Sequence, residues 1–376
     1  MKNRRDFIKA SLLAGATLGP VGKLMAKEWK PITTKIKPLN ILILGGTSFL
    51  GPHQIAYALE RGHSISTFTR GKTVPTIKKS VFDNVEQLIG DRADNLEALK
   101  GRKWDAVIDN SGNKEEWTRM SAELLKDNVG LYLYTSSTGV FYPYLGAGMT
   151  EDSPVVMEMP DNLNEMQELE YGFGVMKARS EVAAKAAFGD RTIIVRPTYM
   201  MGPGDRTDRF TYWPVRLQKG GEIMVPGKAN DPVQHIDVRD VAEYMIRLIE
   251  TGTTGTSNAV GPAGEMTMSE FVHGAHAAFS SPAKYTHVSD YSWLSEKYNL
   301  YDMVPWIVPT GENYGSARVN FDKAISQGLT YRPLADSVRD IYYWWMSDAV
   351  TQKRRNQLES GIMAQEAEML TAWKKR

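Results

Sequence analysis

The chain has 376 residues, of which 42% are hydrophobic and 24% charged, and its formal net charge is +1. This length and composition suit a globular protein with one large core or two smaller ones, and the near-neutral charge gives no electrostatic reason to expect nucleic acid or an anionic membrane as the main partner. No cysteine is present and no apolar run reaches the ~18 residues of a membrane span, which excludes disulfides, thiolate metal sites, cysteine nucleophiles and a membrane-spanning helix.

Residues 1–30 have the layout of a signal peptide, with a basic start, a weakly apolar stretch over 10–18 and small residues near Ala26. The run NRRDFIK at 3–9 resembles a twin-arginine export signal. Twin-arginine export carries folded proteins, so the resemblance implies a periplasmic or secreted protein that brings its own cofactor. The alternative interpretation is a frayed amphipathic N-terminus.

Residues 40–51, NILILGGTSFLG, place a continuous apolar strand directly before a glycine turn. A helix is predicted next, over PHQIAYALERGH, with a stop at Gly62. In this strand–turn–helix context, the backbone N–H groups at the start of the helix can hold the pyrophosphate of a dinucleotide. Gly45 and Gly51 stand where such a motif needs them, whereas Ser48 takes the place of the middle glycine.

Further strands are predicted at 64–71, 85–91, 103–112, 130–137 and 191–197. Helical patterns separate most of them, which indicates an α/β fold: a Rossmann-type doubly wound parallel sheet with a smaller C-terminal substrate-binding part. The expected dinucleotide-binding domain covers 36–200, with 230–260 returning to it. The substrate-binding part covers 201–229 and 261–348, and a helix is expected over 350–376.

The order of several short segments supports a family resemblance. These segments are GGTSFLG at 45–51, GDR at 90–92, YTSSTGVF at 134–141, MKARSE at 176–181, RPTYMMGPGD at 196–205 and VQHIDVRDVA at 233–242. From about residue 39 to residue 345 the chain resembles the extended short-chain dehydrogenase/reductases, the NAD-dependent epimerase/dehydratase family. It looks most like the subgroup whose first turn reads GGTxFLG.

The resemblance implies a set of residues around NAD or NADP. They are Gly45, Thr47, Ser48, Phe49, Leu50 and Gly51 in the first turn, Asp91 near the adenine, Asn110 and Ser111 at the fourth strand, Lys177, and Pro197. Asp91 has an alternative interpretation as a simple turn cap. The second strand ends without the acid that selects NAD, and Arg70 follows it. Its guanidinium can pair with a 2′-phosphate, which favours NADP slightly, or it can stack on the adenine of either cofactor.

The resemblance also implies a serine, tyrosine and lysine that carry out the chemistry. Ser137 matches the serine that binds the reacting hydroxyl or carbonyl, and Lys177 matches the lysine that holds the ribose and lowers the tyrosine pKa. The tyrosine position, four residues before the lysine, holds Phe173, which has no ionisable oxygen.

Three interpretations of this departure remain open. Tyr171 substitutes for the phenol, if Gly172 and Gly174 let the chain enter the helix irregularly. Alternatively, another group moves the proton, with Tyr142, Tyr144 and Glu151 as candidates. In the third interpretation the chain is deficient in hydride chemistry.

A substrate is expected beyond the carboxyl ends of the strands. The segments that project there contain aromatic and charged residues, of which Tyr142, Arg206, Arg209 and Trp213 are the substrate-binding candidates. Such a set suits a sugar, which is apolar on one face and polar at its edge. The alternative for Trp213 and Trp306 is a place in the core of the smaller domain.

These expectations combine into an exported, NAD(P)-dependent sugar epimerase or oxidoreductase that retains its cofactor and works in a redox-neutral cycle. The alternatives are a catalytically silent NAD(P)-binding scaffold and an RNA-binding relative, because the GGTxFLG subgroup includes plastid stem-loop-binding proteins. The expected partners are a carbohydrate and a second copy of the chain, without nucleic acid. No metal site is expected, since His273 and His276 lack further ligands at metal-binding spacing.

Overall fold

The computed structural model describes residues 36–297 and 303–376. Residues 38–376 form one compact unit. The expected export signal lies outside the described residues, as do Tyr301 and Asp302 in the last of the expected substrate-facing segments.

A parallel seven-stranded sheet forms the centre of this unit and confirms the predicted Rossmann-type α/β fold. Its strands lie in the order β10-β6-β5-β4-β1-β2-β3. All the predicted strands are present, as β1 (Asn40–Leu44), β2 (Ser64–Thr69), β3 (Glu86–Ile89), β4 (Trp104–Asp109), β5 (Val129–Thr135) and β6 (Thr192–Pro197). Strand β10 (Gly255–Ala259) pairs with β6 and extends the sheet.

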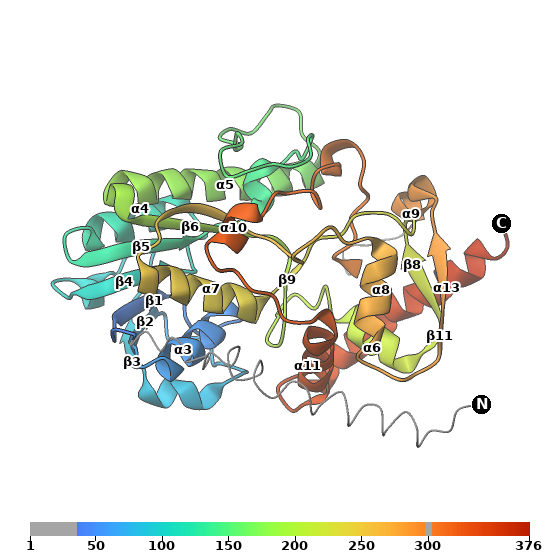
Figure 1. Cartoon of the computed structure of the whole chain (residues 1–376), viewed down its shortest axis with the longest axis horizontal. Helices are drawn as coiled ribbons and strands as arrows, with labels where there is room; N and C mark the ends of the chain where they lie inside the picture. Colours follow the sequence, from blue (N-terminus) through green and yellow to red (C-terminus); the bar gives the residue numbers. More distant parts are fainter. Residues whose placement is uncertain (1–35, 298–302) are drawn as a thin grey trace, which may run out of the picture. The chain divides into compact units, whose positions relative to one another are not determined.

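The sheet is buried on both faces, which explains why β1 reads as an uninterrupted apolar run. Ile41 and Ile43 pack into the core under α3 (Leu50–Glu60) and α7 (Val238–Thr251). Leu42 and Leu44 point the other way, into the core under α4 (Glu115–Leu125) and α5 (Glu165–Phe188). Figure 1 shows α4 and α5 on one side of the sheet and α3 and α7 on the other.

The order of the strands reverses at β1, which has β2 on one side and β4 on the other. In open parallel sheets, ligands bind in the crevice outside the carboxyl ends of the strands at this switch point. The glycine turn follows β1, and Asn110 and Ser111 follow β4. The topology therefore brings these two predicted cofactor segments to one crevice.

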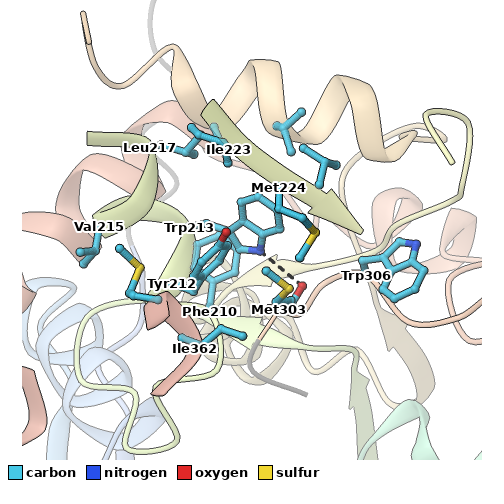
Figure 2. Packing of buried hydrophobic residues seen from close by; sticks show 14 of the residues in the cluster. Phe210, Tyr212, Trp213, Val215, Leu217, Ile223, Met224, Met303, Trp306 and Ile362 are labelled. Carbon is cyan, nitrogen blue, oxygen red and sulfur yellow. Dashed lines mark hydrogen bonds between the residues drawn. The ribbon is translucent and has the colours of Figure 1, made fainter. Parts of the chain in front are cut away.

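A second core lies beyond the sheet. It is built by α6 (Tyr212–Lys219), β8 (Gly221–Pro226), α8 (Met268–His276), α11 (Leu334–Met346), α12 (Gln352–Leu358) and α13 (Ala364–Trp373). Figure 2 shows Trp213 and Met224 packed in its interior, with the Trp213 indole donating to the backbone of Met303. The expected C-terminal helix is present as α12 and α13, with a π-helical turn over Glu359–Met363 between them, and it completes this core.

Short 3₁₀-helices lie at Lys79–Asn84, Glu97–Leu99, Thr138–Phe141, Gly189–Arg191 and Gly311–Asn313. The remaining described strands and α-helices are also short. They are β7 (Met200–Met201), β9 (Ile236–Asp237), α9 (Tyr291–Lys297), α10 (Asp322–Ser326) and β11 (Ala283–Val288), which pairs with β8.

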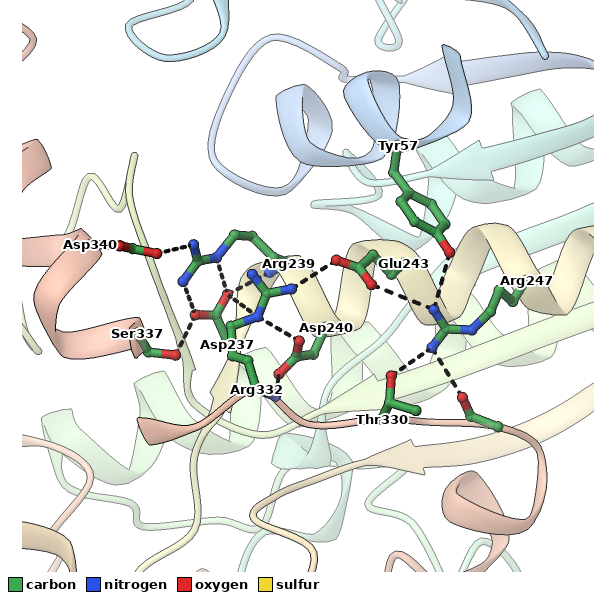
Figure 3. A network of polar contacts seen from close by, with 11 residues as sticks. Tyr57, Asp237, Arg239, Asp240, Glu243, Arg247, Thr330, Arg332, Ser337 and Asp340 are labelled. Atoms are coloured by element: carbon green, nitrogen blue, oxygen red, sulfur yellow. Dashed lines mark hydrogen bonds and ion pairs between the residues drawn. The ribbon is translucent and has the colours of Figure 1, made fainter. Parts of the chain in front are cut away.

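An ion-pair network joins α7 to α11, as Figure 3 shows. Asp237 caps α7 and accepts a hydrogen bond of 2.6 Å from Ser337, while Arg239 reaches Asp340 at 2.6 Å.

Candidate functional site

The glycine turn after β1 leaves almost no room for side chains. A Cβ at Gly51 would lie 2.2 Å from the carbonyl oxygen of Gly46, and a Cβ at Gly45 would lie 2.6 Å from the Cβ of Ser111. Gly45 also has a φ of +82°, a conformation that favours glycine. Phe49 precedes α3 with a φ of 44° and provides no side-chain cap, so no side chain blocks the positive end of this helix. Of its first residues, Gly51 already donates its N–H to the Ser48 carbonyl at 3.1 Å and Pro52 has no N–H.

A crevice opens beside this turn, between the carboxyl ends of β1, β2, β3 and β4. Its lining includes Gly45, Thr47, Phe68, Thr69, Arg70, Lys72, Thr73, Gly90, Asp91, Arg92, Ser111, Asn113 and Trp117. The structure thus brings five of the predicted cofactor residues to one cavity, namely Gly45, Thr47, Arg70, Asp91 and Ser111. Asp91 also accepts a hydrogen bond of 3.0 Å from the Ala93 N–H, so it caps a turn while it lines the crevice.

Below the crevice lies a buried ion pair that sequence patterns did not reveal. The Arg92 guanidinium contacts both carboxylate oxygens of Asp109 and also donates to Ser111 at 3.1 Å. Burial opposes the charge on Asp109, but Arg92 and a hydrogen bond from Tyr132 hold the pKa of this carboxyl below its ordinary value. The pair fixes Ser111, and through it the wall that faces Gly45. In the sequence, the only feature noted near this ion pair is the GDR segment at 90–92, which contains Arg92.

Asn110 is engaged by neighbouring side chains beneath the switch point. Its Oδ1 accepts from the Thr135 hydroxyl at 2.8 Å, and its Nδ2 donates to Gln54 at 2.6 Å. These bonds tie the ends of β4 and β5 to α3. Pro197 lies buried at the end of β6 beside Ala259 and is not among the residues that line the crevice.

Lys177 projects from α5 to the end of β5, where its Nζ donates to the Thr135 carbonyl at 2.9 Å. Burial lowers the pKa of this ammonium to about 8, with Arg92 acting in the same direction and Asp109 and Glu181 opposing. Glu181, on the next turn, is held by Ser136 and by a bidentate contact with Arg196. The lysine is therefore fixed at the edge of the sheet where the crevice opens.

Phe173 and Ser137 lie next to each other, around Gly139. A Cβ on Gly139 would lie 2.9 Å from Cε1 of Phe173 and 3.3 Å from the Oγ of Ser137. Gly174 lets α5 approach this turn closely, since a Cβ there would lie 2.6 Å from the Gly139 carbonyl oxygen. The Nζ of Lys177 lies 5.8 Å from the centre of the Phe173 ring. Phe173 therefore stands beside the serine and the lysine, but it brings no ionisable oxygen.

Tyr171 does not join this group. Helix α5 runs regularly from Glu165 through Gly172 and Gly174, so the irregular helix start that would bring Tyr171 into register is not present. Six residues from Lys177, Tyr171 faces elsewhere and packs edge-on against Tyr142 with ring centres 4.8 Å apart. Burial raises the pKa of its phenol. The interpretation in which Tyr171 replaces the missing phenol is corrected on this ground.

The other proton-transfer candidates are engaged to different degrees. Glu151 is structural, because its Oε1 accepts from the Asn258 N–H at 2.8 Å. Tyr142 is buried and donates to Glu312 at 2.8 Å, and burial raises the pKa of its phenol. Tyr144 forms a hydrogen bond with Thr138, the residue after Ser137, and burial raises the pKa of its phenol as well.

The predicted substrate residues separate into two groups. Arg209 stacks over Tyr199 with its guanidinium carbon 5.0 Å from the ring centre, close to Glu170 on α5, and Arg206 is exposed in the same loop. Trp213 is fully buried in the second core and donates to the Val304 carbonyl at 3.0 Å, so its expected substrate contact is corrected. Trp306 is also a core residue.

Two further properties concern the whole described chain. Across 36–297 and 303–376, no cluster of three histidine, aspartate or glutamate side chains is arranged to hold a metal ion. Within the same ranges, no helix is both long and apolar enough to cross a bilayer.

Comparison with known proteins identifies the family. The model of the NAD dependent epimerase/dehydratase family matches residues 41–261. The epimerase family protein SDR39U1 of Bos taurus is 26% identical over 260 residues, covering 65% of this chain and 82% of that protein. The chloroplast stem-loop binding protein of 41 kDa b of Arabidopsis thaliana is 26% identical over 223 residues, covering 56% of this chain and 55% of that protein.

Among solved structures, the dTDP-glucose 4,6-dehydratase of Bacillus anthracis in complex with NAD has a TM-score of 0.59 at 17% identity, covering 82% of this chain and 97% of that one. This likeness shows the shared fold. The family match extends from β1 to the end of β10 and so includes the whole sheet and its crevice. It also includes Phe173 and Lys177 on α5. The chain therefore belongs to the NAD-dependent epimerase/dehydratase family.

Proposed function

We propose that this chain is an exported NAD(P)-dependent epimerase or oxidoreductase that acts on a sugar. It retains its cofactor, and a modified site stands where the family has tyrosine and lysine. The observation that carries the proposal is the crevice at the β1/β4 switch point, beside a turn in which Gly51 and Gly45 allow close backbone packing and α3 begins without a side-chain cap. Family membership and the NAD bound to the Bacillus anthracis dehydratase support a dinucleotide as that ligand.

The residues at the crevice fit each part of a dinucleotide. The N–H groups at the start of α3 would hold the pyrophosphate, Asp91 would lie at the adenosine end, and Lys177 would reach the nicotinamide ribose. A bound nicotinamide would supply a hydride acceptor and donor beside Ser137. Arg70 and Lys72 line the adenosine end of the crevice, so we favour NADP slightly over NAD.

The redox-neutral cycle follows from the proposed location. Outside the cytoplasm there is little free NAD(P), so an enzyme that oxidises and re-reduces one substrate needs no external supply. Arg209 and Tyr199 offer a polar edge and an aromatic face to a sugar ring. The proposed location has its own test, in which residues 1–35 are fused to a folded reporter. Export that continues after Arg4 and Arg5 both become lysine would contradict it.

A silent scaffold is the second candidate, because Phe173 removes the phenol on which the family's chemistry depends. The RNA-binding alternative has the chloroplast relative behind it and the net charge of +1 against it. The deciding experiment is mass spectrometry of the nucleotide released when the purified protein is denatured. We expect NADP or NAD in an amount comparable to the protein, whereas protein free of nucleotide would contradict the retained cofactor.

A further inference from the structure

The face of α5 that carries Phe173 and Lys177 also carries a carboxylate. Glu170 stands three residues before Phe173 and seven before Lys177, and the helix is regular over this whole stretch. At ~100° per residue, these spacings place all three side chains within about 60° of one another around the helix. Glu170 is therefore one turn nearer the N-terminal end of α5 than the position of the missing phenol, on the same side.

The neighbours of Glu170 belong to the substrate side of the site. Its carboxylate interacts electrostatically with Tyr144, which is hydrogen-bonded to Thr138, the residue that follows Ser137. It also interacts with Tyr142 and with Arg209, whose guanidinium stacks on Tyr199. Segments from β5, β6 and α5 thus meet around this carboxylate.

Within the described residues, Glu170 differs from Glu312 and Glu151 in having no hydrogen-bond partner for its carboxylate. Both oxygens of Glu312 are engaged, one by the Tyr142 hydroxyl at 2.8 Å and the other by the Gln167 amide at 2.9 Å. Glu151 is held by the Asn258 backbone. In the described part of the chain, no hydrogen bond holds the carboxylate of Glu170, which leaves its oxygens available to a ligand.

The environment of Glu170 suits proton transfer. Burial raises the pKa of its carboxyl above the ordinary value, with the positive charge of Arg209 opposing. The titratable and charged groups that interact electrostatically with it are Arg209, Tyr142 and Tyr144. A carboxyl whose pKa moves toward neutrality can both accept and return a proton near the working pH.

We propose that Glu170 takes over the proton transfer that the family assigns to the tyrosine, and this inference rests on the proposed function. Oxidation of a substrate alcohol to a ketone would need a hydride acceptor, which a bound nicotinamide would supply. In that step a carboxylate oxygen of Glu170 would accept the hydroxyl proton, and it would return the proton when the ketone is reduced again on the same or the opposite face. Ser137 donates a hydrogen bond to the reacting oxygen throughout.

The test compares full-length wild-type protein with Glu170→Gln, with Glu168→Gln, and with the double variant Glu170→Gln/Phe173→Tyr. Glu168 is a matched control, because it is an exposed glutamate on the first turn of the same helix. Each protein is loaded with NAD or NADP and mixed with glucose, galactose, UDP-glucose or dTDP-glucose. Because the proposed cycle re-reduces its own substrate, reduced nicotinamide is followed by absorbance as it forms transiently within a single turnover, and cofactor affinity is measured separately.

We expect Glu170→Gln to slow the reduction of the nicotinamide by ~10²–10⁴-fold, because a general base contributes about that much to the rate. The affinity for the cofactor should stay unchanged. Glu168→Gln should leave the rate unchanged, and Phe173→Tyr should restore part of the rate in the double variant. A rate in Glu170→Gln equal to that of the wild type would overturn the assignment while leaving the proposed function intact. Wild-type protein without affinity for either cofactor would refute the proposed function instead.

A second measurement needs no turnover. Infrared difference spectra between wild type and Glu170→Gln, recorded across pH, report the titration of this one carboxyl. We expect its pKa to lie above the ordinary value of a glutamate carboxyl, about 4.3. Titration of Glu170 at or below that value would count against the assignment even if none of the probe sugars reacts.

Discussion

The crevice and the face of α5 that carries Phe173 and Lys177 both lie at the carboxyl ends of the strands. They differ in how closely their residues match the pattern of the family. At the crevice, the glycine turn and the switch point are both in place, although Ser48 replaces the middle glycine and Arg70 stands where an NAD-selecting acid is expected. On α5, the lysine is kept and the phenol is gone. The backbone must fit a cofactor closely, whereas a proton can be moved by any ionisable group of suitable pKa within reach. Binding is thus more constrained than proton transfer.

The largest expected effect is at the crevice. Gly51→Ala should abolish binding of NAD and NADP, because the new Cβ would lie 2.2 Å from the Gly46 carbonyl oxygen and push the turn away from α3. Gly264→Ala is the matched control, since a Cβ there meets nothing within 4 Å. Fluorescence titration with each nucleotide measures the change, and circular dichroism checks the fold. Unimpaired binding in Gly51→Ala would contradict the close fit at the turn.

The buried Arg92–Asp109 pair beneath the crevice should contribute more to the free energy of unfolding than an exposed ion pair does. Asp109→Asn should lower the free energy of unfolding by ~3–5 kcal/mol, because it leaves the Arg92 guanidinium buried without its counter-charge. Glu97→Gln breaks an exposed pair with Lys100 and should cost only about 0–1 kcal/mol. Urea unfolding of both variants makes the comparison. Similar losses in the two would show that the Arg92–Asp109 pair is no more than a surface contact.

The acid dependence of stability tests two histidines, one behind the crevice and one near the second core. Burial lowers the pKa of His53 and of His235 to about 4. Below about pH 6.5 these histidines take up protons in the unfolded chain, whereas in the folded chain they stay neutral down to about pH 4. The free energy of unfolding should therefore decrease as the pH is lowered from about 6.5 to about 4. The slope contributed is about 1.4 kcal/mol per pH unit for each histidine.

The variant His235→Phe identifies one of these contributions. It should reduce the slope between pH 6.5 and pH 4 by up to about half, measured by urea unfolding at several pH values. A slope unchanged from that of the wild type would mean that His235 takes up its proton in the folded state as easily as in the unfolded chain.

The smallest effect concerns the helix itself. Gly172→Ala should stabilise the protein by about 0.5–1 kcal/mol, because Gly172 lies inside a regular helix with open space where its Cβ would be. Thermal unfolding measures the change. A destabilised variant would favour an irregular start of α5 and reopen the case for Tyr171.

Much of the fold could be predicted because it is encoded locally. The apolar run of β1, its glycine turn and the helix that stops at Gly62 follow one another in the sequence, as do the later strands. Strand β10, GTSNA, could not be recognised in this way, because it is short and polar and is defined by its pairing with β6.

The site was less predictable than the sheet. The register of Phe173 and Lys177 follows from helical spacing, and the same spacing would have pointed to Glu170 had carboxylates on that face been considered. The Arg92–Asp109 pair and the engagement of Glu151 depend on contacts between distant segments, which local patterns do not specify. For Trp213 the sequence left a substrate contact and a core position open, and its full burial in the second core bears out the core position.

The most direct measurement is a titration of the purified wild-type chain, freed of any bound nucleotide, with NAD and with NADP. Trp117 lines the crevice, so its fluorescence reports occupancy. We predict saturable binding of at least one of the two nucleotides, lost in Gly51→Ala and kept in Gly264→Ala. No binding of either nucleotide to correctly folded wild-type protein would contradict the assignment of this crevice as a dinucleotide site.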